Sequence, residues 1–334
     1  MRRGIALALL LVLLVAVLIN FVPFSHAEES DYVKHGSLSL CGNGEFFSWA
    51  RSEGIPGKGT PDDPFIIRNY EFEENRWGWA IYLSGVTYFV VIEHCYIRGT
   101  IFLQACKHLT IRDTIVYKGQ PPHDDSYYWY TDWPYWVGIG GISCSYIRIF
   151  NCKIFLGAND GAGIDFWRSH HITIRDCNIT CTYPTNAGVG CTFRAVSHLT
   201  IINCTVKHTR TGFYFLRHPK TFAGERHVFL RDCKAIDLDC IGMSIQAKNF
   251  TAENCYIQGA RQGIVVGEST ETSIVDTVVE DALYYGFSGR GDGTFINCTA
   301  RNCLGGFYFD WPGACFMCTA EHNRFGFILC SRVE

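Results

Sequence analysis

A short phrase of strand-forming residues recurs along most of this 334-residue chain, and it constrains the fold more than any other feature. The phrase has two parts: a glycine followed by alternating apolar residues, and a second alternating segment that ends in Asp or Asn and then Cys. Alternation with a period of two is typical of β-strands, and neither segment is long enough for a helix. Recurrence roughly every 20–30 residues is the signature of a solenoid.

The phrase can be followed from one repeat, or rung, to the next. A cysteine, or a threonine in its place, recurs at Cys95, Thr114, Cys152, Cys177, Cys204, Cys233, Cys255, Thr277, Cys298 and Cys318. The glycine recurs at Gly141, Gly163, Gly190, Gly212, Gly242, Gly263, Gly286, Gly306 and Gly326. One rung cannot bury its apolar side alone, but rungs stacked about 4.8 Å apart can. The sequence therefore predicts an all-β fold, a single-stranded parallel β-helix of about eleven rungs.

Stacking in register would place equivalent residues above one another in columns. One interior column is expected to contain Ile164, Cys191, Phe213, Met243, Ile264, Phe287, Phe307 and Phe327. The Cys/Thr series should form another, mostly reduced, because cysteine packs there as a small hydrophobe and parallel side chains have poor disulfide geometry. The better disulfide candidates lie outside this ladder: Cys41, Cys106, Cys144, Cys181, Cys191, Cys240, Cys303, Cys315 and Cys330.

The repeated phrase resembles that of right-handed parallel β-helix proteins of the pectate lyase-like and NosD type, over about residues 57–330. The segment from Gly57 to Ile67 also resembles the opening of archaeal NosD-like proteins. The resemblance implies the right-handed form of the fold. It leaves the function open, because this repeat serves lyases, hydrolases, epimerases, adhesins and surface proteins alike.

The ends of the chain carry different signals from its body. Residues 1–27 have the features of a signal peptide or an N-terminal membrane anchor, since two arginines precede an apolar run over residues 5–24. Either way the body is expected outside the cytoplasm, in the periplasm, at the cell surface or in the medium. Residues 28–56 would form an N-terminal cap or linker, and residues 57–334 the β-helix domain.

Two further expectations concern partners. The formal net charge of −3 gives no reason to expect nucleic acid. The segment Gly326 to Cys330 has the pattern of a last rung without a cap, which would allow end-to-end self-association through unpaired strand edges.

Function is expected where the repeats are interrupted. The segments that lead to Gly141, Gly163 and Gly190 are longer than the others and would emerge side by side. The largest is rich in aromatic residues with acidic neighbours, a combination that suits sugar rings. Its expected ligand-binding residues are Trp129, Tyr130, Asp132, Trp133 and Trp136. The alternative is that this loop only covers the wall of the β-helix.

Charged residues next to these loops suggest the kind of ligand. Arg168, Arg194 and Arg217 are expected one per rung, beside Tyr214 on the outward side of the glycine strand. Arginines stacked beside aromatic rings would hold the carboxylates of an acidic polysaccharide, although a solvated charged corner would look the same in sequence. We predict an exported or cell-surface protein that binds polysaccharide through residues 119–138, 157–168 and 181–194.

A polysaccharide lyase or hydrolase acting on acidic glycans is a second hypothesis. Asp165 and Asp160 are the candidate catalytic residues, because inverting hydrolysis needs two carboxyl groups across the scissile bond. Asn159-Asp160-Gly161 resembles part of the polygalacturonase N-T-D motif without its threonine. The R-x-P-x-x-R motif of pectate lyases begins at Arg217 but is incomplete.

Metal-dependent and purely structural roles complete the set of hypotheses. A lyase would use calcium, for which Asp237, Asp239 and Glu225 are candidate ligands; otherwise no cofactor is expected. The NosD resemblance implies a copper-related periplasmic role. No metal site is predicted, and the only candidate ligands are a file of imidazoles, at His171, His198 and His227. A structural surface protein without a ligand is the remaining hypothesis.

Overall fold

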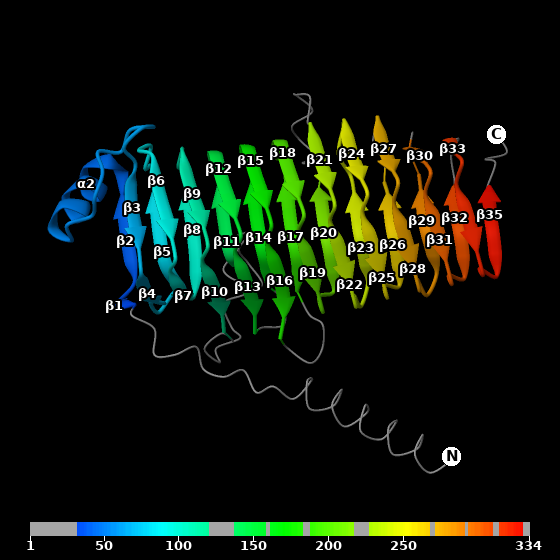
Figure 1. Ribbon diagram of the computed structural model, residues 1–334, viewed down its shortest axis with the longest axis horizontal. Helices are drawn as coiled ribbons and strands as arrows, with labels where there is room; N and C mark the ends of the chain where they lie inside the picture. The colour runs from blue at the N-terminus through cyan, green and yellow to red at the C-terminus, as the bar shows by residue number, and fades with distance from the viewer. Residues whose placement is uncertain are drawn as a thin grey trace, which may run out of the picture. The chain divides into compact units, whose positions relative to one another are not determined.

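The computed structural model describes residues 32–119, 137–157, 161–182, 188–216, 227–267, 271–290, 293–309 and 314–329. From Val33 onward the chain forms one unit, in which successive rungs stack along a common axis (Figure 1). The rungs contribute strands to three parallel sheets, which have 12, 12 and 11 strands within the described residues. The predicted all-β parallel β-helix of about eleven rungs is confirmed.

The three sheets are built from every third strand. The first sheet contains β1 (Val33–His35), β4 (Tyr70–Glu73), β7 (Tyr96–Arg98), β10 (Ile115–Lys118), β13 (Lys153–Leu156), β16 (Asn178–Cys181), β19 (Thr205–Lys207), β22 (Lys234–Ile236), β25 (Tyr256–Gln258), β28 (Val278–Glu280), β31 (Thr299–Arg301) and β34 (Thr319–Glu321). The second contains β2 (Leu38–Cys41), β5 (Trp79–Ser84), β8 (Thr100–Gln104), β11 (Val137–Ile142), β14 (Ala162–Trp167), β17 (Val189–Arg194), β20 (Thr211–Leu216), β23 (Ile241–Ile245), β26 (Gln262–Val266), β29 (Tyr285–Gly289), β32 (Gly305–Phe309) and β35 (Phe325–Leu329). The third contains β3 (Phe65–Arg68), β6 (Val90–Glu93), β9 (Leu109–Arg112), β12 (Ser145–Phe150), β15 (His170–Arg175), β18 (Ser197–Ile202), β21 (Val228–Arg231), β24 (Phe250–Glu253), β27 (Thr272–Val275), β30 (Gly293–Ile296) and β33 (Ala314–Phe316).

The β-helix begins earlier than residue 57, the start expected from the sequence. β1 and β2 already pair with β4 and β5, so part of the expected cap or linker is the first rung. Helix α2 (Gly42–Ser52) lies at this end (Figure 1) and buries Phe46 and Ala50 completely. The described part of the chain holds no helix long and apolar enough to cross a membrane, and the apolar run over residues 5–24 lies outside it.

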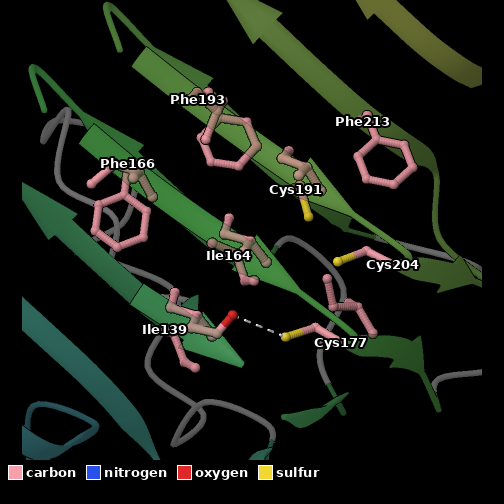
Figure 2. Close-up of a cluster of buried hydrophobic side chains, with 14 of the residues drawn as sticks. Ile139, Ile164, Phe166, Cys177, Cys191, Phe193, Cys204 and Phe213 are labelled. Atoms are coloured by element: carbon pink, nitrogen blue, oxygen red, sulfur yellow. Dashed lines mark hydrogen bonds between the residues drawn. The ribbon is translucent and has the colours of Figure 1, made fainter. Parts of the chain in front are cut away.

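The predicted interior column is confirmed residue by residue. Consecutive strand partners run Ile164, Cys191, Phe213, Met243, Ile264, Phe287, Phe307 and Phe327. Figure 2 shows the first three of these side chains in the buried space between the sheets. Further along, the ring of Phe307 stacks on those of Phe287 and Phe327 with centroids 4.8 Å apart in both cases.

The prediction that Gly141 belongs to the column of repeat glycines is wrong. Ile139 pairs with Ile164, so the neighbour of Gly163 is Gly138 and not Gly141. Strand β11 contains three glycines, and spacing alone does not show which of them continues the column. The backbone of the next rung sets the requirement for glycine: a Cβ added to Gly163 would lie 2.7 Å from the carbonyl oxygen of the following glycine.

Fifteen cysteines in the described residues are free thiols, among them the disulfide candidates Cys41, Cys191, Cys240, Cys303 and Cys315. The ladder cysteines stack in the core as expected. Cys106 and Cys144, which we considered disulfide candidates, form a second column at another corner, where the amide of Ser145 donates to the carbonyl of Cys106. Their thiols lie 3.2 Å and 3.4 Å from the carbonyl oxygens of buried leucines in the preceding rung. Cys330 lies outside the described residues.

Candidate functional site

Two columns of side chains run along the outer face of the second sheet. One column consists of Tyr82, Phe102, Gly140, Asp165, Thr192 and Tyr214. The next consists of Ser84, Gln104, Ile142, Trp167, Arg194 and Leu216. Paired residues lie about 4.8 Å apart, so strands β5 to β20 present these side chains as one surface. It brings together Asp165, Arg194 and Tyr214, as the sequence predicted.

An ion pair lies in the middle of this outer face. Nη2 of Arg194 donates a hydrogen bond of 2.5 Å to Oδ2 of Asp165 in the preceding rung. Only 5% of Asp165 is exposed; burial raises the pKa of its carboxyl group, and the Arg194 guanidinium opposes that rise. Among the described residues, Oδ1 of Asp165 and Nε of Arg194 are buried and have no hydrogen-bond partner. The pair therefore leaves one acceptor and one donor unsatisfied.

Trp167 is a site residue that the sequence-based prediction missed. The guanidinium carbons of Arg168 and Arg194 lie 4.7 Å and 5.9 Å from the centroid of its ring. A cation over an aromatic face is an attractive arrangement. The signal was present in the sequence, because Trp167 follows Asp165 on the outward side of the same alternating strand.

The predicted column of arginines is not formed. Arg194 pairs with Trp167, whereas Arg168 lies one residue further, in the turn after β14, with a φ of 49°. A shift of one residue along a strand reverses the side on which the side chain lies, so the two arginines reach the Trp167 ring from different backbone positions. Arg217 lies outside the described residues.

The three interruptions of the repeat leave and rejoin the stack in neighbouring rungs. Lys118, Leu156 and Cys181 are consecutive partners where they begin. Val137, Ala162 and Val189 are consecutive partners where they end. The expected site residues within them lie outside the described residues: Trp129, Tyr130, Asp132, Trp133, Trp136 and Asp160.

A cluster of aromatic rings occupies the same outer face two and three rungs before Asp165. The ring planes of Trp79, Tyr82 and Phe102 lie within 13° of one another, with centroids 4.7 to 6.2 Å apart. The hydroxyl of Tyr82 donates to Oε1 of Gln104 at 2.6 Å, which fixes the ring. The face therefore has two aromatic groups, the second centred on Trp167.

The candidate histidines stack in a column, as predicted, but they do not form a metal site. The rings of His171 and His198 lie 4.5 Å apart and 2° from parallel, and His227 continues the column at 5.4 Å. The parallel rings of His171 and His198 direct their in-plane lone pairs side by side, so these two do not converge on one ion. No group of three or more His, Cys, Asp or Glu within the described residues has the arrangement of a metal site.

The candidate calcium ligands do not gather in the described part of the chain either. Asp237 lies 3.8 Å from Nδ1 of His208, and Glu225 lies outside the described residues. Beside the histidine column is an open cavity of about 370 Å³ on the third sheet, whose lining includes Tyr146, Arg148 and Phe229.

The three sheets and their register define a parallel β-helix protein. The family model described as "Right handed beta helix region" matches residues 101–249 and 193–331. The chain therefore belongs to the right-handed β-helix family, which confirms the predicted handedness. Among curated proteins, no sequence matches this chain.

Several solved structures are similar to the chain at low identity. The periplasmic alginate epimerase AlgG has 10% identity and a TM-score of 0.48, over 75% of this chain and 70% of that one. A hyperthermoactive exopolygalacturonase from Thermotoga maritima has 14% identity and a TM-score of 0.47, over 70% of this chain and 55% of that one. The tailspike protein of E. coli bacteriophage HK620, solved with a pentasaccharide, has 9% identity and a TM-score of 0.48, over 86% and 57%. Values this low carry no argument about activity.

Proposed function

We propose that this protein binds acidic polysaccharide through the outer face of the second sheet around Trp167. The observation that carries the proposal is the Trp167 ring with the guanidinium groups of Arg168 and Arg194 over it. An aromatic face accepts the C–H face of a sugar ring, and a guanidinium group donates paired hydrogen bonds to a carboxylate. A uronic acid unit presents both features.

The surroundings of Trp167 support a ligand of several sugar units. Tyr214 is partly exposed two rungs after Asp165, and the cluster of Trp79, Tyr82 and Phe102 lies before it on the same face. The aromatic loops at residues 119–138, 157–168 and 181–194 begin and end along this edge, so the proposal keeps them as contributors. The proposed setting is extracellular, periplasmic or at the cell surface, with residues 1–27 as signal or anchor.

Replacement of the tryptophan tests this proposal. Trp167→Ala is expected to weaken binding of polygalacturonate or alginate oligosaccharides about tenfold, because loss of one aromatic contact with its cations costs roughly 1–2 kcal/mol. Isothermal titration calorimetry measures the change. Phe229→Ala is the matched control, since it removes a ring with Arg231 5.8 Å away on the third sheet. Loss of affinity in the control but not in Trp167→Ala would overturn the proposal.

A second candidate function is turnover of the bound glycan by a lyase or hydrolase, with Asp165 as general acid or base. It is favoured by the burial of Asp165, its raised pKa and its unsatisfied Oδ1, which are traits of catalytic carboxyl groups. Asp165→Asn would then abolish product formation from polyuronides and leave binding largely intact. A wild-type protein that binds these glycans without releasing products would exclude this candidate.

End-to-end association is the remaining structural proposal. It is favoured by the exposed aromatic side chains of the last rungs, Phe316, Phe325 and Phe327.

A further inference from the structure

Five cysteines in consecutive rungs form an unbroken column in the core: Cys152, Cys177, Cys204, Cys233 and Cys255. None is more than 2% exposed. Cys177, Cys204, Cys233 and Cys255 are each followed by a residue whose backbone amide donates a hydrogen bond to the preceding rung. The acceptor is the carbonyl oxygen of the cysteine in that rung, at 2.8 to 2.9 Å. The backbones are therefore in strict register. Figure 2 shows the sulfur atoms of Cys177 and Cys204 directed into the same buried space.

The spacing of this column matches a particular kind of metal coordination. Strands in register are about 4.8 Å apart, so the midpoint between successive sulfur atoms is roughly 2.4 Å from each. That is about the length of a metal–thiolate bond, which is ~2.3 Å for zinc. Soft monovalent ions such as Ag(I) and Cu(I) accept two thiolates in a line, and thiolates select soft ions. Ions that need three or four ligands do not fit, because no such group converges within the described residues.

We propose that this cysteine column binds soft monovalent metal ions in alternate gaps, each ion held in line between the sulfur atoms of two successive rungs. In each occupied gap two S–H bonds are replaced by two bonds from sulfur to metal, both protons leave to solvent, and nothing is oxidised or reduced. No sulfur then has to bridge two ions, and each ion between two thiolates leaves a single net negative charge, where separate thiolates in the core would be prohibitive.

The pKa shifts of the five thiols differ in direction along the column. Hydrogen bonding from the thiols above and below lowers the pKa of Cys177 and of Cys233. The same hydrogen bonds, together with burial, raise the pKa of Cys152, Cys204 and Cys255. Since binding displaces protons, occupancy is expected to rise with pH.

The chain itself supplies a conservative replacement for these cysteines. Thr114 and Thr277 occupy the same column, and their hydroxyl groups donate to the carbonyl two residues earlier, at 2.8 Å and 2.9 Å. The thiols of Cys177 and Cys233 lie 3.2 Å and 3.3 Å from the equivalent carbonyl oxygens. A Cys→Thr substitution therefore keeps the side-chain hydrogen bond and the size of the residue while removing the sulfur.

Two double variants test the geometry with equal numbers of thiols removed. Cys177→Thr/Cys233→Thr interrupts all four gaps in the column, because every gap includes one of these residues. Cys152→Thr/Cys255→Thr leaves the two central gaps intact. The reduced proteins are titrated with Ag(I), with circular dichroism as the check of folding. The first variant is expected to lose the column ions of the wild type, about two, and the second about one.

X-ray absorption at the silver edge of the wild-type protein gives a readout that needs no variant. Two sulfur neighbours per ion are expected. Equal losses in the two double variants would show that silver binding follows the number of thiols and not their stacking, and would overturn the proposal. A third sulfur or nitrogen neighbour around the column ions would do the same, as would a wild-type protein that binds no more silver than the two double variants.

Discussion

Gly242→Ala is expected to destabilise the protein by about 3 kcal/mol, at the upper end of the cost of overpacking. A Cβ at this position would lie 2.1 Å from Cγ2 of Ile257 and 2.7 Å from the carbonyl oxygen of Gly263. The second contact is with the backbone of the next rung, which cannot move without breaking its own strand pairing. Urea unfolding followed by circular dichroism measures the change.

Gly44→Ala is the matched control for this substitution. Gly44 lies in helix α2 with nothing within 4 Å of an added Cβ, so alanine should stabilise the helix by up to about 1 kcal/mol. We expect Gly242→Ala to lower the free energy of unfolding and Gly44→Ala to raise it. A Gly242→Ala protein as stable as wild type would mean that the rungs do not approach as closely as the structure shows.

Arg194→Ala is expected to cost about 3 kcal/mol at pH 7, because it leaves the buried carboxylate of Asp165 without its partner. Asp165→Asn should cost less, since the side chain of Arg194 is 32% exposed and can turn toward water. Urea unfolding at pH 7 measures the difference between these two costs. It is carried out on the wild type, both single variants and the double variant.

The cost of Arg194→Ala should also depend on pH. Burial raises the folded-state pKa of Asp165 above its unfolded value of about 3.9, so the protonated form is the better accommodated one. The resulting contribution to stability is complete below the unfolded pKa and is lost as pH rises through the folded pKa. Removal of the arginine raises the folded pKa further. The variant should therefore be less destabilised at pH 4 than at pH 7, and equal destabilisation at both would argue against a buried charge as the cause.

The columns of the fold were predictable because a period of two and a fixed register leave little freedom. The Asp or Asn before each ladder cysteine illustrates this. Asn151, Asn203, Asn254 and Asn297 each donate to an aspartate of the preceding rung, at 2.6 to 2.7 Å. The residues alternate between acid and amide along the column, so carboxylates lie two rungs apart. The sequence displays this order, and its physical reason is the avoidance of adjacent like charges.

The outer face was predicted less well, because its details depend on single-residue register. Arg194 lies four residues after Gly190 and ends its strand, whereas Arg168 lies five residues after Gly163 and follows its strand. Trp167, four residues after Gly163, is the strand partner of Arg194, so the prediction was wrong by one residue. The first rung was missed for another reason. β1 and β2 alternate, with Leu38 and Leu40 buried, but they do not carry a glycine and a cysteine at the positions by which the repeat was recognised. The role of the aromatic loop at residues 119–138 stays a prediction.

The most direct test of the proposed function is hydroxyl-radical footprinting of the protein with and without polygalacturonate oligosaccharides. Trp167 and Tyr214 are partly exposed on the outer face of the second sheet, and Tyr146 is 46% exposed beside the cavity on the third. The proposal predicts that the ligand slows oxidation of Trp167 and Tyr214 and leaves Tyr146 unchanged. Protection of Tyr146, with Trp167 oxidised at its original rate, would contradict it.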